Sequence, residues 1–495
     1  MRRLIVQLVH LLLRLFFRRV EVTGLEHVPA EGGGVLVAWH PNGMIDPALL
    51  FETCPRPVVF GARHGLFKVP MLGAILRATE TVPIYRALDM GEDASEEARA
   101  AANEKSLDAL SDAVVRGRFA ALFPEGMSHD APHLMALKTG VARLYYRACE
   151  RKRPEDPTPV LVPVGLHYDE KRLFRSSVLV SYHPPMALPE ALAGVPPADE
   201  PHEARRARYR AFTDEIERVL YEVVHATESW DDHHLMHRAR KLVRAERAFR
   251  TGAQLAKPTM EERTRAFARI WTGYQARRAT HPREVEALIA RVAEYDADLR
   301  ALRIEDHELD RPPRIVNAWL GLLLLLQAVL VYFLFPPIMV LGGIVNVPPA
   351  LALYAVSRWA SKTEKDEASI KILAGSLIFP AAWLTAALLA GWGHHTLHAM
   401  YPGVPDAFVT AGALTALLAI AGGAISLRYL RLARETARAI RVRMTRERCR
   451  MTIARLRVDR AELCDALVAM AEGIDLPGRV LPDGTIAKRE AAPSG

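Results

Sequence analysis

Apolar residues follow three different patterns along this chain of 495 residues. In residues 20–190, short runs rich in Val, Ile, Leu and aromatic residues alternate with helical stretches. This alternation is typical of an α/β domain in which helices flank a mixed sheet. Residues with high β-propensity predict strands at residues 34–39, 57–60, 81–85, 119–123, 160–166 and 177–182.

The second pattern covers residues 191–310, which are strongly charged, rich in Ala, Arg and Glu, and poor in Gly. Apolar residues recur there at helical spacing, so we predict a helical appendage. Its basic faces suit phosphate headgroups, although a solvated helix surface is the commoner meaning of such charge runs.

The third pattern predicts a transmembrane helical bundle in residues 311–430. Four apolar segments, at residues 315–335, 337–357, 372–390 and 407–427, each have about the length that crosses a bilayer. The second segment is rich in Pro and Gly, so a re-entrant or interfacial hairpin is its alternative. Basic residues gather at alternate ends of the segments, which places both soluble parts in the cytoplasm. They are Arg311, Arg314, Arg358, Lys362, Lys365, Lys371, Arg428 and Arg431.

The two ends of the chain have patterns of their own. In residues 1–19, leucines recur at helical spacing beside several arginines, and no small-residue cleavage site follows. We therefore expect an amphipathic helix in the membrane interface; a helix packed on its own domain is the alternative. In residues 431–495, we expect a basic helix to about residue 472 and then a disordered tail.

Composition narrows the choice of partner and compartment. The net charge of +8 fits nucleic acid or an anionic membrane surface, and the long apolar runs favour anionic membrane lipid over nucleic acid. The four cysteines are scattered, without the paired spacing of a zinc site or a disulfide framework. An integral membrane protein whose soluble parts face the cytoplasm fits best.

The turn after the first long strand carries the most informative residues. His40 follows that strand, and Asp46 stands directly before Pro47, where we expect a helix N-cap. The Pro-Asn-Gly sequence between them can fold the chain back, so that a general base meets the carboxylate that orients it. Alternatively, Asp46 is only a cap and His40 an ordinary loop histidine.

A second turn brings another carboxylate to a strand end. Glu125 lies in the Phe-Pro-Glu-Gly sequence of residues 123–126, directly after the strand at 119–123. Loops at strand ends carry function more often than chance. The alternative is a turn in which Glu125 is simply solvated.

Together these stretches resemble the glycerolipid acyltransferase family, which comprises glycerol-3-phosphate and lysophosphatidate acyltransferases. Four blocks match in order over about residues 20–190. They are His40 with Asp46, the Val-Pro-Ile-Tyr-Arg sequence of residues 82–86, residues 123–126, and the apolar residues 160–165. The family usually has four residues between His and Asp, whereas this chain has five, which resembles a variant turn.

The resemblance implies an acceptor site as well as a base. Arg86, Glu125 and Gly126 would hold the phosphate end of the acceptor, and Lys138 would add a further phosphate contact. Guanidinium and ammonium groups suit a phosphate monoester. Because direct contact of Glu125 with phosphate would be repulsive, we expect it to orient Arg86 or a glycerol hydroxyl. Exposed surface charge is the alternative for Arg86 and Lys138.

The implied reaction moves a fatty acyl group from acyl-CoA or acyl-carrier protein to a hydroxyl of glycerol-3-phosphate or 1-acylglycerol-3-phosphate in phospholipid synthesis. His40 would remove the hydroxyl proton, and Asp46 would stabilise the imidazolium. No nucleophile elbow lies beside His40, so a covalent acyl-enzyme is not expected. Direct attack by the hydroxyl needs no metal or other cofactor. The competing hypothesis is a membrane transporter or lipid-binding scaffold with a degenerate acyltransferase domain. The choice of acceptor, and that between CoA and carrier protein, stay open.

Overall fold

The computed structural model describes residues 2–69, 72–85, 96–197, 199–253, 257–310, 335–361, 367–481 and 485–488. The described chain divides into two compact units. The first unit holds the residues up to His233 together with Pro258–Ala268 and residues 367–369. The second unit holds the remaining residues.

A seven-stranded sheet forms the centre of the first unit, in the order β1-β7-β6-β2-β5-β3-β4. Every pair of neighbours is parallel except β6 and β7, which run antiparallel. This confirms the predicted mixed sheet. The strands are β1 (Arg19–Thr23), β2 (Gly34–Ala38), β3 (Val58–Arg63), β4 (Val82–Ile84), β5 (Phe119–Leu122), β6 (Val160–Tyr168) and β7 (Ser177–Tyr182).

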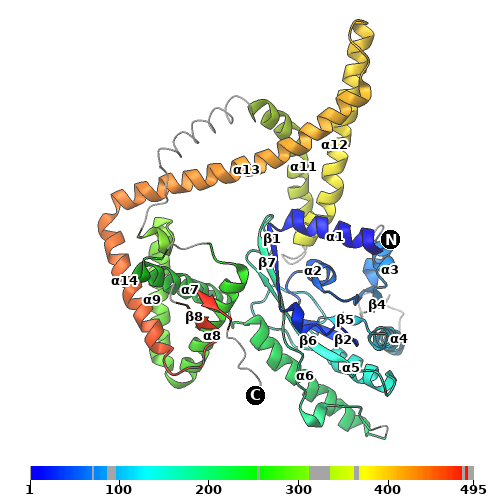
Figure 1. Ribbon diagram of the computed structural model, residues 1–495, viewed down its shortest axis with the longest axis vertical. Helices are drawn as coiled ribbons and strands as arrows, with labels where there is room; N and C mark the ends of the chain where they lie inside the picture. The colour runs from blue at the N-terminus through cyan, green and yellow to red at the C-terminus, as the bar shows by residue number, and fades with distance from the viewer. Residues whose placement is uncertain are drawn as a thin grey trace. The chain divides into compact units, whose positions relative to one another are not determined.

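Helices flank both faces of this sheet (Figure 1). One face packs against α4 (Glu96–Val115), α5 (Gly140–Arg151) and α6 (His202–Val224), while α1 (Arg2–Phe16) and α2 (Ile45–Thr53) pack together on the other. A short α3 (Leu72–Ala78) packs against the 3-10 helix His64–Lys68 that follows β3. Because both faces are covered, every residue of β2 is buried.

The first unit extends beyond the boundary at residue 190 that the sequence predicts. Phe212, Ile216 and Leu220 recur at the spacing of one helix face, and they join the core that Val35 and Leu144 also enter. The charges of α6 therefore lie on the opposite face, and this helix belongs to the sheet domain rather than to the appendage.

In the second unit, α9 (Pro282–Leu302) and α14 (Arg450–Met470) share a core with α7 (Trp230–Thr251). Leu242, Val292, Leu299 and Leu456 meet there. Most of the predicted appendage after His233 and the predicted C-terminal basic helix are thus parts of one packed unit. Near the end of the chain, a two-stranded hairpin, β8 (Arg479–Val480) and β9 (Ile486–Ala487), lies where we expected a disordered tail.

Buried ion pairs in this unit join residues that lie far apart in the sequence. Arg460 has no exposed surface, and it donates to Glu246 at 2.8 Å and to Asp310 at 2.8 Å. Arg238 donates to Asp306 at 2.6 Å. Buried ionic groups need such partners because desolvation is costly. Part of the charge in these segments is therefore interior structure and not a solvated helix surface.

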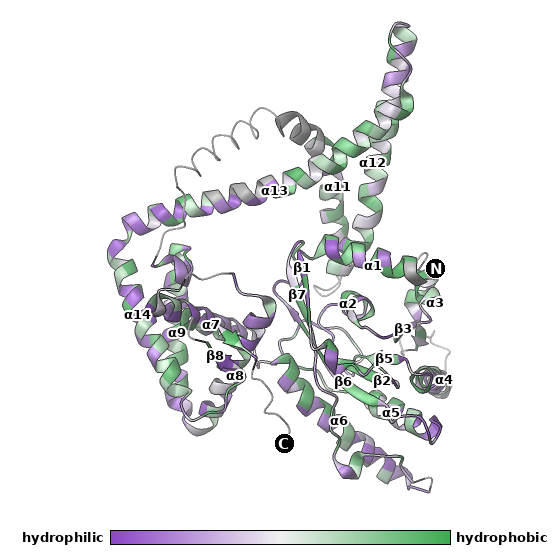
Figure 2. Cartoon of the chain, in the orientation of Figure 1, coloured by the Kyte–Doolittle hydropathy of each residue, from purple (hydrophilic) through white to green (hydrophobic). Residues whose placement is uncertain are grey.

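Three apolar helices also belong mainly to the second unit: α11 (Phe335–Ala360), α12 (Glu367–Met400) and α13 (Phe408–Arg448). Within the described residues, Glu367–Met400 and Phe408–Arg428 are long and apolar enough to cross a membrane. Figure 2 shows hydrophobic residues along α12 and in the first part of α13, whose later part is more hydrophilic.

The other two predicted spans have different outcomes. Residues 315–334 lie outside the described residues. Residues 337–357 lie within α11, which continues through Pro348 and Pro349 as a helix and not as a hairpin. It is not among the described helices that are long and apolar enough to cross a membrane, so this span stays a prediction. The helix α12 extends to Met400, so the connection that we expected at residues 391–406 shortens to residues 401–407.

A single amide links these three helices. Asn346 of α11 donates through Nδ2 to the carbonyl of Ala419 in α13 at 2.8 Å, and its Oδ1 accepts from Trp383 of α12 at 2.9 Å. At Gly342 an added Cβ would come within 2.7 Å of the Gly422 backbone. Small residues that allow close backbone approach, together with a shared polar side chain, are typical of helix packing in lipid.

Candidate active site

His40 and Asp46 meet in the structure. His40 follows β2, and its Nδ1 lies 2.8 Å from Oδ2 of Asp46, whose side chain is completely buried. The helix α2 begins at Ile45 and has no side-chain cap, so Asp46 stands in the first turn and is not the N-cap that we predicted. The carboxylate is thus engaged by the histidine instead of by the helix end.

The turn between them is closed by its own backbone. The Asn42 N–H donates to Oδ2 of Asp46 at 2.7 Å, and Gly43 adopts a positive φ of 44°. Lys171 donates through Nζ to the carbonyl of Pro41 at 3.2 Å, and its own carbonyl accepts from Asn42 Nδ2 at 3.3 Å. The turn with five intervening residues therefore still delivers the carboxylate to the imidazole.

Tyr168 completes the surroundings of Asp46. It ends β6, and its hydroxyl donates to Oδ1 of Asp46. Burial, and then the negative charge of Asp46, raise the pKa of Tyr168 well above its usual value, so the phenol stays a protonated donor. Tyr168 was not predicted from the sequence, because it meets Asp46 only through the parallel pairing of β6 with β2, which brings the carboxyl ends of both strands to one edge of the sheet.

Glu125 lies at the same edge because β5 is also parallel to β2. Its Oε2 accepts from the His40 backbone N–H at 2.8 Å, and its Oε1 accepts from the Met135 N–H at 3.0 Å. Oε1 also lies 2.5 Å from Nε2 of His129, whose N–H donates to the His40 carbonyl at 3.1 Å. The Glu125 carboxylate, with no exposed surface, thus holds the His40 backbone N–H, while the backbone N–H of His129 holds the His40 carbonyl. Its predicted part in orienting the acceptor stays a prediction.

The His40 ring keeps one edge open. It stacks on Phe123 with ring centres 4.1 Å apart and planes at 15°, and 16% of the side chain is exposed. Nδ1 is engaged by Asp46, whereas no described residue bonds Nε2. A neutral imidazole held in this way presents Nε2 as a proton acceptor.

Lys138 approaches the Glu125-Gly126 turn. Gly126 has a φ of 68°, and a Cβ placed on it would lie 2.8 Å from Nζ of Lys138. The Lys138 N–H donates to the carbonyl of Pro124 at 2.8 Å, which fixes the backbone at this point. The side chain is exposed, and no described carboxylate pairs with it. Arg86 lies outside the described residues.

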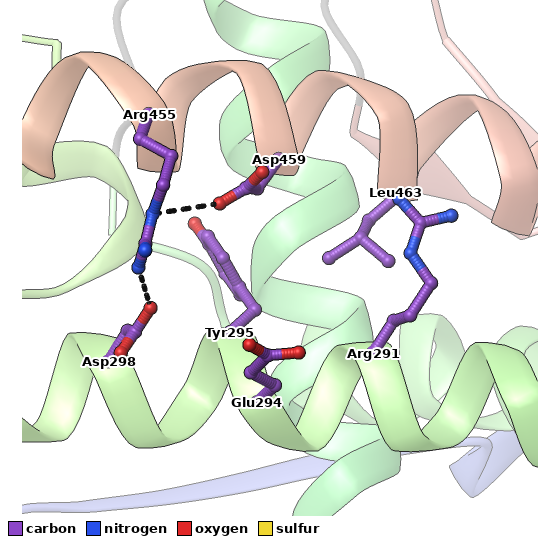
Figure 3. A pocket seen from close by; sticks show the side chains of 7 residues that line it. All are labelled: Arg291, Glu294, Tyr295, Asp298, Arg455, Asp459 and Leu463. Atoms are coloured by element: carbon purple, nitrogen blue, oxygen red, sulfur yellow. Dashed lines mark hydrogen bonds and ion pairs between the residues drawn. The ribbon is translucent and has the colours of Figure 1, made fainter.

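A small cavity of about 170 Å³ lies elsewhere, between α9 and α14 of the second unit (Figure 3). Both of its arginines are already paired, because Arg455 contacts Asp298 and Asp459. Arg291 pairs with Glu462, which lies outside the lining, at 3.0 Å. The described lining therefore offers no unpaired cation to an anionic ligand.

Comparison with known proteins identifies the region that holds the histidine site. Residues 19–167 match the family model described as Acyltransferase. This region is an acyltransferase-family domain. The match includes His40, Asp46, Glu125, Gly126 and Lys138, and it ends one residue before Tyr168.

Two curated yeast proteins that are similar to the chain are named as acyltransferases. The chain is 28% identical over 263 residues to glycerol-3-phosphate O-acyltransferase 1 of Saccharomyces cerevisiae, which covers 53% of this chain and 32% of that protein. It is 25% identical over 272 residues to glycerol-3-phosphate O-acyltransferase 2 of the same yeast, covering 54% and 34%. The match thus spans about a third of the length of either relative.

Among solved structures, the chain is similar to the 1-acyl-sn-glycerophosphate acyltransferase of Thermotoga maritima. That match has a TM-score of 0.30 and 16% identity, and it covers 45% of this chain and 78% of the other. The sheet order and the His40 contacts given above are observed in this chain itself and do not depend on that match.

Proposed function

We propose that this acyltransferase domain moves a fatty acyl group from the thioester of acyl-CoA or acyl-carrier protein to a hydroxyl of glycerol-3-phosphate or 1-acylglycerol-3-phosphate. The observation that carries the proposal is the His40 imidazole, held at Nδ1 by a buried Asp46 and open at Nε2. The names of the curated yeast relatives support this substrate class.

His40 acts as the general base in the proposed reaction. Its Nε2 takes the proton of the acceptor hydroxyl while the oxygen attacks the thioester carbonyl, and the Asp46 carboxylate stabilises the imidazolium that forms. The new C–O bond replaces the C–S bond, and the departing thiolate takes the proton from the imidazolium. The histidine is therefore neutral again at the end of each turnover.

The phosphate of the acceptor binds beside the Glu125-Gly126 turn. The exposed Lys138 ammonium supplies a positive charge next to the backbone of Gly126, and Arg86 supplies a guanidinium from the chain after β4. Two cations of this kind suit the double negative charge of a phosphate monoester.

The same domain works at a bilayer in this proposal, with anionic lipid as its surface. The outward face of α1 exposes Leu4, Leu8, Leu11 and Leu15, and the sequence of this helix contains no acidic residue. Such a face suits the membrane interface. The opposite face packs on α2, where His10 Nδ1 lies 2.5 Å from Glu52.

A second contact ties the catalytic turn to an apolar helix. The Met44 N–H donates to Oγ of Ser369 at 3.2 Å, and Ser369 and the fully buried Ala368 stand in the first turn of α12. We place the bilayer surface at which the domain works on the cytoplasmic side.

The direct test uses the purified chain in nanodiscs with a labelled acyl donor, offered as acyl-CoA and as acyl-carrier protein. Glycerol-3-phosphate and 1-acylglycerol-3-phosphate are supplied in parallel, with His40→Ala as the matched control. We expect labelled product with at least one acceptor and none with His40→Ala. Acyl transfer to neither acceptor, or equal acyl transfer by His40→Ala, would contradict the proposal and favour a scaffold function.

A further inference from the structure

The buried carboxylate of Asp46 has two oxygens with different partners. Oδ2 bonds Nδ1 of His40 and accepts from the N–H of Asn42, at 2.8 and 2.7 Å. Oδ1 accepts from the Tyr168 hydroxyl, which comes from another strand 122 residues further along the chain. Asn42 and Asp46 belong to one short turn, so Tyr168 is the partner of the Asp46 carboxylate that comes from the sheet.

We propose that Tyr168 is a positioning residue of the His40–Asp46 pair, whose hydroxyl fixes the plane of the Asp46 carboxylate and thereby aims Nε2 of His40 at the acceptor hydroxyl. The proposal rests on the acyl-transfer function proposed above. It concerns the residue that holds the base in place and not a group that touches the substrate.

The geometry of the carboxylate explains why a third residue matters. A carboxylate held at one oxygen alone turns about its Cβ–Cγ bond, and the imidazole bonded to it then tilts. A donor on the second oxygen stops this rotation, as second partners of catalytic and metal-bound groups generally do. Because Asp46 is completely buried, water does not replace a lost donor on Oδ1 without rearrangement.

The charged groups around His40 and Asp46 have other partners, so the test changes only the hydrogen bond from Tyr168 to Asp46. Glu125 and His129 pair with each other and hold the His40 backbone. Lys171, whose ammonium donates to the Pro41 carbonyl, is paired with Asp130. Replacing Tyr168 by Phe removes one uncharged donor and alters none of these charges.

The experiment compares Tyr168→Phe with Tyr182→Phe, using the full chain in nanodiscs. Tyr182 is a control because it is a buried tyrosine on β7 of the same sheet, but its hydroxyl bonds Thr53 Oγ1 at 2.9 Å and not the dyad. For each variant, kcat, the KM of both substrates and the pH profile of kcat/KM are measured.

For Tyr168→Phe we expect the plateau kcat to fall by about tenfold, with both KM values unchanged, because the loss affects the chemical step. The acid limb of the profile should move to higher pH by about half a unit, since a carboxylate with one donor fewer holds a protonated imidazole more strongly. Tyr182→Phe should change neither quantity.

Should Tyr168→Phe fail to fold, 3-fluorotyrosine at position 168 keeps the ring in place. Its more acidic hydroxyl is a stronger donor, so the acid limb should move to lower pH. An unshifted profile in the folded variant, or the same change in Tyr182→Phe, would overturn the positioning role. If His40→Ala is as active as the unmodified chain, the acyl-transfer function itself fails.

Discussion

At the scale of single residues, the open edge of His40 makes the most direct prediction. His40→Ala should lower acyl transfer by about a thousandfold, the range expected for a lost general base. Folding and membrane association should be unchanged, because the backbone of residue 40 is held by Glu125 and His129. Labelled product formation measures the first effect, and circular dichroism and membrane fractionation measure the second.

A matched control separates the base from histidine substitution in general. His27 lies in a short 3-10 helix after β1, away from the dyad. His27→Ala should keep activity within about twofold, as surface substitutions usually do. Near-normal turnover of His40→Ala would show that the imidazole is not the base.

Asp46 gives a second prediction because its charge and its shape can be separated. Asp46→Asn keeps a similar volume and an oxygen acceptor but loses the negative charge, so we expect a loss of about a hundredfold in kcat. Asp46→Ser should be at least as damaging. A fully active Ser variant would mean that the Asp46 carboxylate is not needed to orient His40, and kcat measured at saturating substrates decides between these outcomes.

Lys138 predicts an effect on acceptor binding rather than on the chemical step. Lys138→Ala should raise the KM of a phosphorylated acceptor by about tenfold and leave the KM of the acyl donor unchanged, because one charge-assisted contact is lost. Gly126→Ala should act in the same direction, since the added Cβ collides with the Lys138 side chain. Arg86→Ala should have the larger effect.

The control for this series is Lys68→Ala, which removes an exposed cation from the short 3-10 helix after β3. Its acceptor KM should stay within about twofold of the unmodified value. An unchanged acceptor KM in both Lys138→Ala and Arg86→Ala would leave the phosphate contacts without support.

Local sequence was sufficient for the residues of a single turn and insufficient for residues brought from other strands. The closeness of His40 and Asp46 depends on a short turn, which residue types predict well. Tyr168 meets Asp46 only because β6 pairs with β2 in a particular register. Such long-range pairing leaves no local signal in the sequence. For the same reason, the hydrogen bond from the His40 backbone N–H to the Glu125 carboxylate was not predicted.

At the scale of elements, the alternation of apolar runs predicted the strands where they are buried. Each predicted strand has a counterpart, whereas β1 was not predicted, although its Arg-Val-Glu-Val-Thr sequence alternates polar and apolar residues as a half-buried strand does. The charged surface of α6 hid its apolar stripe of Phe212, Ile216 and Leu220, so the domain boundary was placed too early.

The exposed leucines of α1 predict contact with lipid. A fluorophore on single cysteines at Leu8 and Leu11, in a background without the native cysteines, should be quenched by lipids that carry a spin label in the acyl chain. Val195, which is 54% exposed in the segment before α6, is the control position and should not be quenched. Equal, weak quenching at all three positions would show that α1 lies away from the bilayer.

At the scale of the whole molecule, hydropathy predicted where apolar helices lie better than where they end. The helix α12 has 34 residues and a length of about 50 Å, which exceeds the roughly 30 Å of bilayer core. Its last turns, with His395 close to Asp406 at 2.9 Å, continue a helix that the apolar pattern ended at residue 390. A hydropathy pattern ends at polar residues, so it does not include the polar last turns of a helix.

The last prediction concerns membrane topology, and it rests on basic residues that flank the apolar segments on alternating sides only. We expect four spans, with residues 401–407 outside the cytoplasm and both the catalytic domain and the chain after Arg428 inside it. Single cysteines at Gly403, Ser361 and Ser494, in a background without the native four, test this with a membrane-impermeant thiol reagent on intact cells. Only Gly403 should be labelled.

Ser361 and Ser494 serve as internal controls for each other, because both should react after the cells are permeabilised. Labelling of Ser494 in intact cells would place the C-terminus outside and require an odd number of spans. The simplest cause would be a failure of α11, with Pro348 and Pro349, to cross the membrane. The segments after it would then invert, and the basic residues at 358–371 would face outward against the charge rule. The alternating positions of the basic residues therefore favour four spans, which is the arrangement that we predict.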